Sequence, residues 1–155
     1  MIGLFIDPGE TSGFCVIEVI SPTKINVLDA FSDGAGGRPP LNLQQRALAL
    51  VGILRTFKPS VVGVEDYRIY PNVAKEHIGT RLWTPELIGC IEAVCGMMIP
   101  PVRVVRIQAA KKGRWPLARL NAKLPQFKQI TSDHALDALR LGLAYLEARV
   151  LWSPS

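Results

Sequence analysis

The chain has 155 residues, a length typical of one domain, and carries 18 Lys and Arg against 13 Asp and Glu, for a net charge of +5. Apolar residues make up 48% and charged residues 20%, a composition typical of folded globular proteins. The sequence has no apolar run of roughly 18 residues, no signal-peptide pattern and no CxxC spacing among its three cysteines. We therefore expect one domain, residues 1–155, of a cytoplasmic bacterial or viral protein, and exclude membrane proteins, secreted proteins and zinc fingers.

The first three predicted elements are strands. Short apolar runs bounded by turn residues predict strands over 1–7 and 13–20. Alternation predicts a third strand over 24–32, with Ile25, Val27 and Phe31 on one face. Because only short turns separate them, we expect these strands to form an antiparallel meander.

Helices and strands alternate in the remainder of the chain. A helix over 43–58 is ended by Pro59, and an apolar run predicts a strand over 60–65. Thr84 is expected to cap a helix that reaches about residue 99, before a strand over 102–107. A last helix, capped by Thr131 or Ser132 and ending near Val150, has a predicted core stripe of Leu136, Leu139, Leu143, Leu146 and Val150. The prolines at 116 and 125 prevent an assignment between 108 and 130.

The resulting order, β-β-β-α-β-α-β-α, predicts an α/β fold with a mixed five-stranded sheet and helices on its faces. The fourth and fifth strands each follow a helix, so we expect them to pair in parallel through right-handed crossovers.

The positive charge is concentrated in one segment. Between residues 103 and 130 there are eight basic and no acidic residues, whereas the remainder of the chain has 10 basic and 13 acidic residues. Aromatic residues at 115 and 127 lie within this segment, which favours a surface that contacts nucleic acid. A merely solubilising surface is the alternative. The basic residues are Arg103, Arg106, Lys111, Lys112, Arg114, Arg119, Lys123 and Lys128.

Acidic residues lie where a candidate site is expected. Asp7 and Glu65 each end a predicted strand, and ligands of open α/β sheets bind at the carboxyl ends of strands. Asp133, His134 and Asp137 share one side of the first turn of the last helix. Asp137 flanks apolar positions and needs a partner, either a metal or the nearby Arg140. Asp133 also suits a helix N-terminus, and His134 an ordinary polar contact.

Oxygen ligands of this kind fit Mg²⁺ or Mn²⁺ and do not fit Zn²⁺. With three or four such ligands, two ions about 4 Å apart would activate water and stabilise the leaving oxygen of a phosphodiester. An acidic centre on a protein with a basic segment therefore predicts a nuclease.

Three segments resemble the motifs of RuvC-type Holliday junction resolvases, in the same order. They are GLFIDPGETSGFCVIE (3–18), VVGVEDY (61–67) and SDHALDALRLGLAYL (132–146). The resemblance covers nearly the whole chain and implies a ribonuclease H-like fold. It implies a metal-dependent endonuclease that resolves four-way DNA junctions in recombination and repair, with Mg²⁺ as cofactor and Mn²⁺ able to substitute.

The resemblance also assigns residues. Asp7, Glu65 and Asp137 would be the catalytic metal ligands, while His134, as a catalytic residue, or Asp133 would take the fourth position. Lys111 and Lys112 would contact DNA and stabilise transition-state charge, with the other basic residues at 114, 119 and 123 gripping the DNA arms. An aromatic wedge into the junction would lie near Tyr67, Arg68 and Tyr70. The helix over 84–99 would join two copies into a homodimer, unless its apolar stripe is simply core.

Three alternatives remain open. The same chemistry can act on flaps, forks and other branched DNA. The segment IDPGETSG (6–13) also resembles the phosphate loop of actin-like ATPases, although those proteins need two such lobes. A non-catalytic junction-binding module on the same fold is the third, but it would have no evident need for the acids.

Overall fold

The structure is a computed structural model that describes residues 1–34, 41–67, 83–124 and 129–152. Its elements confirm the predicted order, and each predicted end lies within about two residues of the observed one. The strands are β1 (Ile2–Asp7), β2 (Gly13–Ser21), β3 (Lys24–Ser32), β4 (Val61–Asp66) and β5 (Arg103–Gln108). The helices are α1 (Leu43–Phe57), α2 (Trp83–Met97), the 3-10 helix η3 (Ala109–Arg114), α3 (Leu117–Lys123) and α4 (Asp133–Ala148).

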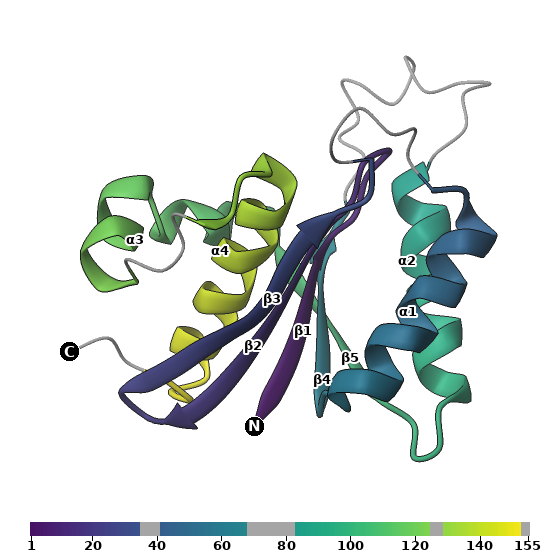
Figure 1. Cartoon of the computed structure of the whole chain (residues 1–155), viewed down its shortest axis with the longest axis horizontal. Coiled ribbons are helices and arrows are strands. Elements are labelled where there is room, and N and C mark those ends of the chain that lie inside the picture. Colours follow the sequence, from purple (N-terminus) through teal and green to yellow (C-terminus); the bar gives the residue numbers. More distant parts are fainter. Residues whose placement is uncertain (35–40, 68–82, 125–128, 153–155) are drawn as a thin grey trace.

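The five strands form one mixed sheet in the order β3-β2-β1-β4-β5. β1, β2 and β3 are antiparallel, and β4 and β5 run parallel to β1. Figure 1 shows α1 and α2 on one face of the sheet and α3 and α4 on the other. The antiparallel meander and the parallel crossover strands are both confirmed, and β1 and β4 are neighbours as the site prediction required.

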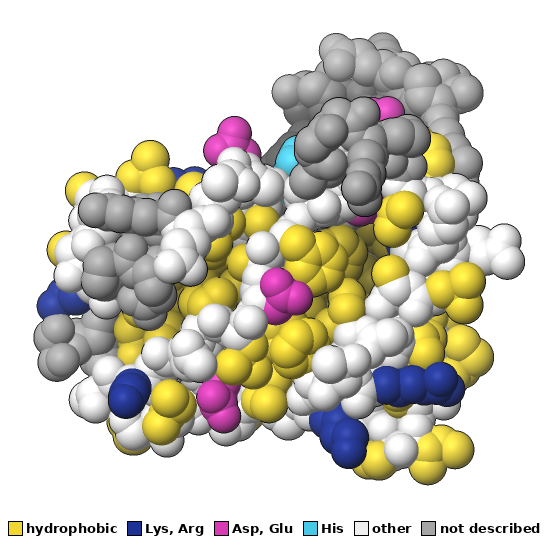
Figure 2. All heavy atoms as spheres, in the orientation of Figure 1, with side chains coloured by type: hydrophobic (Ala, Val, Ile, Leu, Met, Phe, Trp, Pro, Cys, Tyr) yellow, Lys and Arg dark blue, Asp and Glu magenta, His cyan; other side chains and the backbone are white. Residues whose placement is uncertain are grey.

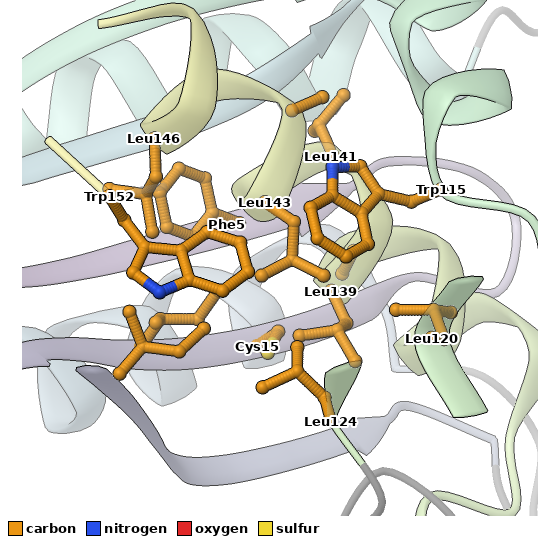
Figure 3. Close-up of a cluster of buried hydrophobic side chains, with 14 of the residues drawn as sticks. Phe5, Cys15, Trp115, Leu120, Leu124, Leu139, Leu141, Leu143, Leu146 and Trp152 are labelled. Carbon is orange, nitrogen blue, oxygen red and sulfur yellow. The ribbon is translucent and has the colours of Figure 1, made fainter. Parts of the chain in front are cut away.

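Helices on both faces explain why the strands are continuous apolar runs. In β1, Leu4 and Ile6 are buried toward α1 and α2, while Phe5 is buried toward α4. The core on the α4 face also contains the stacked indole rings of Trp115 and Trp152, whose centroids lie 5.2 Å apart (Figure 3). These tryptophans attach the segment after β5, which the prolines left unassigned, to α4.

Two glycines, one in α4 and one in β4, leave room for the ring of Phe5 between the helix and the sheet. A Cβ at Gly142 would lie 2.5 Å from the ring, and one at Gly63 would lie 2.6 Å from it. Side chains at these positions would push the helix or the ring away. The close approach brings the N-terminal turn of α4 toward the carboxyl ends of β1 and β4.

The prediction that Ile25, Val27 and Phe31 share one face of the third strand is wrong. Val16 pairs with Asp29 and Ile17 with Val27, so a bulge at Leu28 inserts one residue. Beyond a one-residue bulge the side chains change face. Phe31 therefore packs on the α1 and α2 side, where its ring stacks on Phe14 with centroids 5.1 Å apart.

Two helix ends also differ from expectation. α2 begins at Trp83, so Thr84 lies inside the first turn instead of capping it, and its hydroxyl lies 3.5 Å from the carbonyl oxygen of Pro8. α4 ends at Ala148, so Val150 leaves the helical period and is 84% exposed. Trp152 is buried in its place. The remaining predicted stripe of α4 packs in the core, and Ser132 is confirmed as the cap.

Among the described residues, no helix combines the length and apolar character needed to cross a membrane.

Candidate active site

Strand pairing places two acids side by side on the α4 face of the sheet. Asp7 lies two residues beyond Phe5, and Glu65 lies two residues beyond Gly63, so both point to the face that α4 covers. The parallel register pairs Ile6 with Val64 just before the two acids. Figure 2 shows a histidine and several acidic side chains at the end of the molecule where Figure 1 places the carboxyl ends of these strands.

A third glycine sets where α4 begins. Gly13 is opposite Asp7 in the β1–β2 pair, and a Cβ built on it would lie 1.9 Å from the carbonyl oxygen of His134. Only glycine permits this contact between β2 and the first turn of α4. The hydroxyl of Ser132 hydrogen-bonds that of Ser32 at 2.8 Å and accepts from the backbone N–H of Ala135. The helix start is thereby fixed beside Asp7.

The three predicted acids converge on one ammonium group. Nζ of Lys112 lies 3.1 Å from Oδ1 of Asp7, 2.6 Å from Oε2 of Glu65 and 3.0 Å from Oδ2 of Asp137. The Lys112 side chain is only 18% exposed, and it reaches the acids from η3, directly after β5. The prediction that these three carboxylates share one place is confirmed. Their common partner here is a lysine.

The electrostatics reflect crowding of negative charge. Burial, together with the neighbouring carboxyl of Asp7, raises the pKa of Glu65 to about 7, although Lys112 lowers it in part. Burial works against the charge on Lys112, but its hydrogen bonds and ion pairs with Glu65, Asp7 and Asp137 outweigh burial and raise its pKa above the ordinary value. The ammonium therefore stays charged while one carboxyl holds a proton easily.

Two further contacts complete the centre. Arg140 lies 3.0 Å from Oδ1 of Asp137, so the i+3 ion pair considered from the sequence is present as well. Nδ1 of His134 lies 3.5 Å from Oδ2 of Asp7, with the imidazole half-exposed. Asp133 is exposed at the start of α4. Of the two residues considered for the fourth position, His134 is the one in contact with Asp7.

The resemblance implies a divalent cation, and the donor set fits one in chemistry. Three carboxylates within 3.1 Å of one cationic atom form a hard-oxygen site of the kind that Mg²⁺ and Mn²⁺ prefer. Within the described part of the chain, no group of three or more His, Cys, Asp or Glu side chains is arranged to hold a metal directly. At the centre, the carboxylate oxygens lie 2.6–3.1 Å from Nζ of Lys112, distances suited to N–H···O contacts. Coordination of Mg²⁺ needs shorter metal–oxygen distances, of about 2.0–2.1 Å.

Sequence reasoning missed a buried ion pair behind the site. Arg46 and Asp33 lie 2.6 Å apart and are almost fully buried. Arg46 donates to the carbonyl oxygens of Gly9 and Glu10, and Asp33 accepts from the backbone N–H of Ser12. Together they hold the turn that follows Asp7. The available signal was a single arginine within the apolar stripe of α1.

The predicted DNA-contacting residues lie in different surroundings. Lys111 and Arg114 share η3 with Lys112, and Lys123 is exposed on α3. Arg119 is engaged within the protein: it lies 3.9 Å over the ring of Trp115 and pairs with Glu147 at 2.6 Å. Tyr67 is half-buried against the core on the α1 and α2 side. Arg68 and Tyr70 fall outside the described residues.

The apolar stripe of α2 belongs to the core. Leu87, Ile88 and Ile91 are buried against the sheet, so this stripe gives no evidence for a dimer. The outward part of this helix exposes Glu86, Gly89, Glu92, Ala93, Gly96 and Met97, of which Met97 is 73% exposed.

The comparisons with known proteins agree with this architecture. No protein-family model and no curated protein matches the sequence. Among solved structures, Thermus thermophilus RuvC in complex with Holliday junction substrate matches with a TM-score of 0.70 at 18% identity, over 96% of this chain and 95% of that chain. The fowlpox virus Holliday junction resolvase matches at 0.62 and 14%, over 96% and 99%. The yeast mitochondrial Holliday junction resolvase matches at 0.61 and 14%, over 96% and 80%. This chain therefore has the ribonuclease H-like fold of the RuvC type, as the motifs predicted.

Proposed function

We propose that this protein is a divalent-metal-dependent endonuclease that resolves four-way DNA junctions. The observation that carries the proposal is the convergence of Asp7, Glu65 and Asp137 on one cation, at the carboxyl end of the sheet in a fold shared with junction resolvases. Three carboxylates held close together repel one another and destabilise the folded protein. A reaction that depends on a bound cation would explain why all three are present.

Asp7, Glu65 and Asp137 would hold Mg²⁺ or Mn²⁺, which supplies an activated water and charge stabilisation for the leaving oxygen. Strands β1 and β4 fix the first two carboxylates, and the docked start of α4 fixes the third. The half-exposed imidazole of His134 beside Asp7 is suited to orienting water or holding a proton at the scissile phosphate.

DNA would approach over η3, at the rim of the acidic centre. Lys111 and Arg114 lie on this short helix together with Lys112. Cations here would contact phosphates and offset the repulsion between DNA and the acids. Arg119 would have to leave Glu147 and Trp115 to join them, so Lys111 and Arg114 of η3 are the stronger candidates for the contact surface.

Resolving a symmetric junction calls for two cuts, and a homodimer with two sites supplies them. The outward face of α2 is the part of this helix that a second copy would meet. Its apolar stripe is core, but a Cβ at Gly89 or Gly96 would meet nothing within 4 Å. A second copy of α2 would meet these two glycines together with Glu92, which is paired with Arg106, and the exposed side chain of Met97.

Cleavage of a labelled synthetic four-way junction tests the proposal, with matched linear duplex and flap controls, in Mg²⁺ and in EDTA. Paired nicks that need Mg²⁺ and are lost in Asp7→Asn would support a junction resolvase. Equal cutting of flap and junction would favour a general branched-DNA nuclease. Tight junction binding without cutting in Mg²⁺ or Mn²⁺ would contradict the proposal and favour a binding module.

A further inference from the structure

We propose that Lys112 is a built-in competitor for the metal: its ammonium occupies the cation position between Asp7, Glu65 and Asp137 and must leave when a divalent ion binds. This inference rests on the proposed function, because it concerns the same acidic centre. It assigns to Lys112 control of metal affinity, a role separate from contact with DNA.

The geometry of the contacts makes the two cations mutually exclusive. The ammonium has three donors, and three different carboxylates lie 3.1, 2.6 and 3.0 Å from Nζ. An ion bound to oxygens of the same three groups would need them at about 2.0–2.1 Å, and would lie almost on top of Nζ. Two adjacent positive charges in a mostly buried site repel strongly.

The site is also arranged to retain the ammonium until something displaces it. Its Nζ donates hydrogen bonds to Oδ1 of Asp7 and Oδ2 of Asp137, and the Lys112 side chain is only 18% exposed. Oε2 of Glu65 is buried, and its hydrogen-bonding capacity is not met by a well-aligned donor despite the 2.6 Å ion pair. A metal can satisfy this oxygen better than the lysine does.

Displacement leaves Lys112 charged and in need of a new anionic partner. It lies on η3 beside Lys111 and Arg114, where DNA phosphates are expected. The ammonium would therefore neutralise the acids while the site holds no metal and become available to the nucleic acid once metal has entered. Lys111 is the natural control, since within the described residues no ion pair joins it to these acids.

Calorimetric titration of Mn²⁺ into the full chain without DNA tests the competition by direct binding. Lys112→Met should bind Mn²⁺ on the order of tenfold more tightly than the wild type, because no charge-assisted contacts have to be broken first. Lys111→Met removes the same charge one residue away and should change the affinity much less. Asp7→Asn should weaken binding, which assigns the measured ion to the acidic centre.

Unfolding temperatures give a second measurement. Without metal, Lys112→Met should melt below the wild type because three acids lose their cation, and Mn²⁺ should raise its melting temperature by more than it raises that of the wild type. If Lys112→Met does not fold without metal, Lys112→Gln, which keeps amide donors without the charge, takes its place in the titration.

The outcomes separate the two proposals. Equal or weaker Mn²⁺ binding by Lys112→Met, or equal tightening in Lys111→Met, would overturn the competition and leave the nuclease proposal standing. Failure of both the wild type and Lys112→Met to bind Mn²⁺ would overturn both. Tighter binding in Lys112→Met alone, with the larger metal-dependent rise in melting temperature, would support the competition.

Discussion

Arg46 and Asp33 form an ion pair 2.6 Å long in which each side chain is at most 2% exposed. The pair joins α1 to the end of β3 and, through the carbonyl oxygens of Gly9 and Glu10, to the turn between β1 and β2. That turn directly follows Asp7. The buried Arg46–Asp33 pair therefore helps to position Asp7, a candidate catalytic acid, through this turn, although neither partner contacts Asp7.

Removing one partner of this pair should be costly. Arg46→Met leaves the Asp33 carboxylate buried and unpaired, so we expect it to lower the free energy of unfolding by about 3–5 kcal/mol. The matched control is Arg106→Met, since Arg106 pairs with Glu92 at 2.8 Å but both are more than 40% exposed. An exposed pair of this kind contributes about 0–1 kcal/mol. Urea unfolding of both variants makes the comparison, and equal losses would contradict the supporting role of Arg46.

Gly13 offers a test of how α4 is placed. Gly13→Ala would put a methyl group 1.9 Å from the carbonyl oxygen of His134, so the start of α4 must move away from β2, and with it from Asp7 on the neighbouring strand. We expect lower stability and a loss of cleavage in the junction assay even at saturating Mg²⁺.

Gly52→Ala is the control for that experiment. Gly52 is exposed within α1, and a Cβ there meets nothing within 4 Å. This substitution should stabilise the protein by about 0.5–1 kcal/mol through helix propensity and leave cleavage unchanged. Full cleavage by Gly13→Ala would show that the site tolerates movement of the helix.

Much of this arrangement could be predicted from local pattern. Strand ends in the sequence located Asp7 and Glu65, because period 2 and parallel pairing fix which face and edge they reach. The helix wheel located Asp137. The position of Lys112 could not be predicted, since it depends on a 3-10 helix in a segment interrupted by prolines, held through the packing of Trp115.

Other features were hidden for different physical reasons. The bulge at Leu28, which turned Phe31 to the other face, leaves no composition signal in an alternating strand. Arg46 was conspicuous within an apolar stripe. Its partner Asp33 lies at the start of a Gly-rich stretch, and only the tertiary structure brings the two side chains together.

The raised pKa of Glu65 predicts a pH dependence of stability. Its pKa is about 7 in the folded protein against an ordinary value of 4.5, so between these pH values the folded state holds a proton that the unfolded state has lost. The wild type should therefore lose stability as pH rises from about 4.5 to 7. Glu65→Gln cannot ionise, so its stability relative to the wild type should rise across the same window. Melting temperatures at pH 4.5, 5.5, 6.5 and 7.5 measure this difference, and a constant difference would show that Glu65 is not the titrating group.

The competition between Lys112 and metal also predicts when this lysine contributes to DNA binding. In EDTA the ammonium is engaged by the three acids, so Lys112→Met should change the salt dependence of junction binding little. In Ca²⁺, with gels confirming that the DNA stays uncut, the displaced ammonium is free to meet a phosphate. The variant should then lower the slope of log affinity against log salt by about one unit. If Lys111, the neighbouring cation on η3, contacts DNA, Lys111→Met should lower this slope by the same amount in EDTA and in Ca²⁺. An equal change for Lys112→Met in EDTA and in Ca²⁺ would mean that the lysine meets DNA without being displaced.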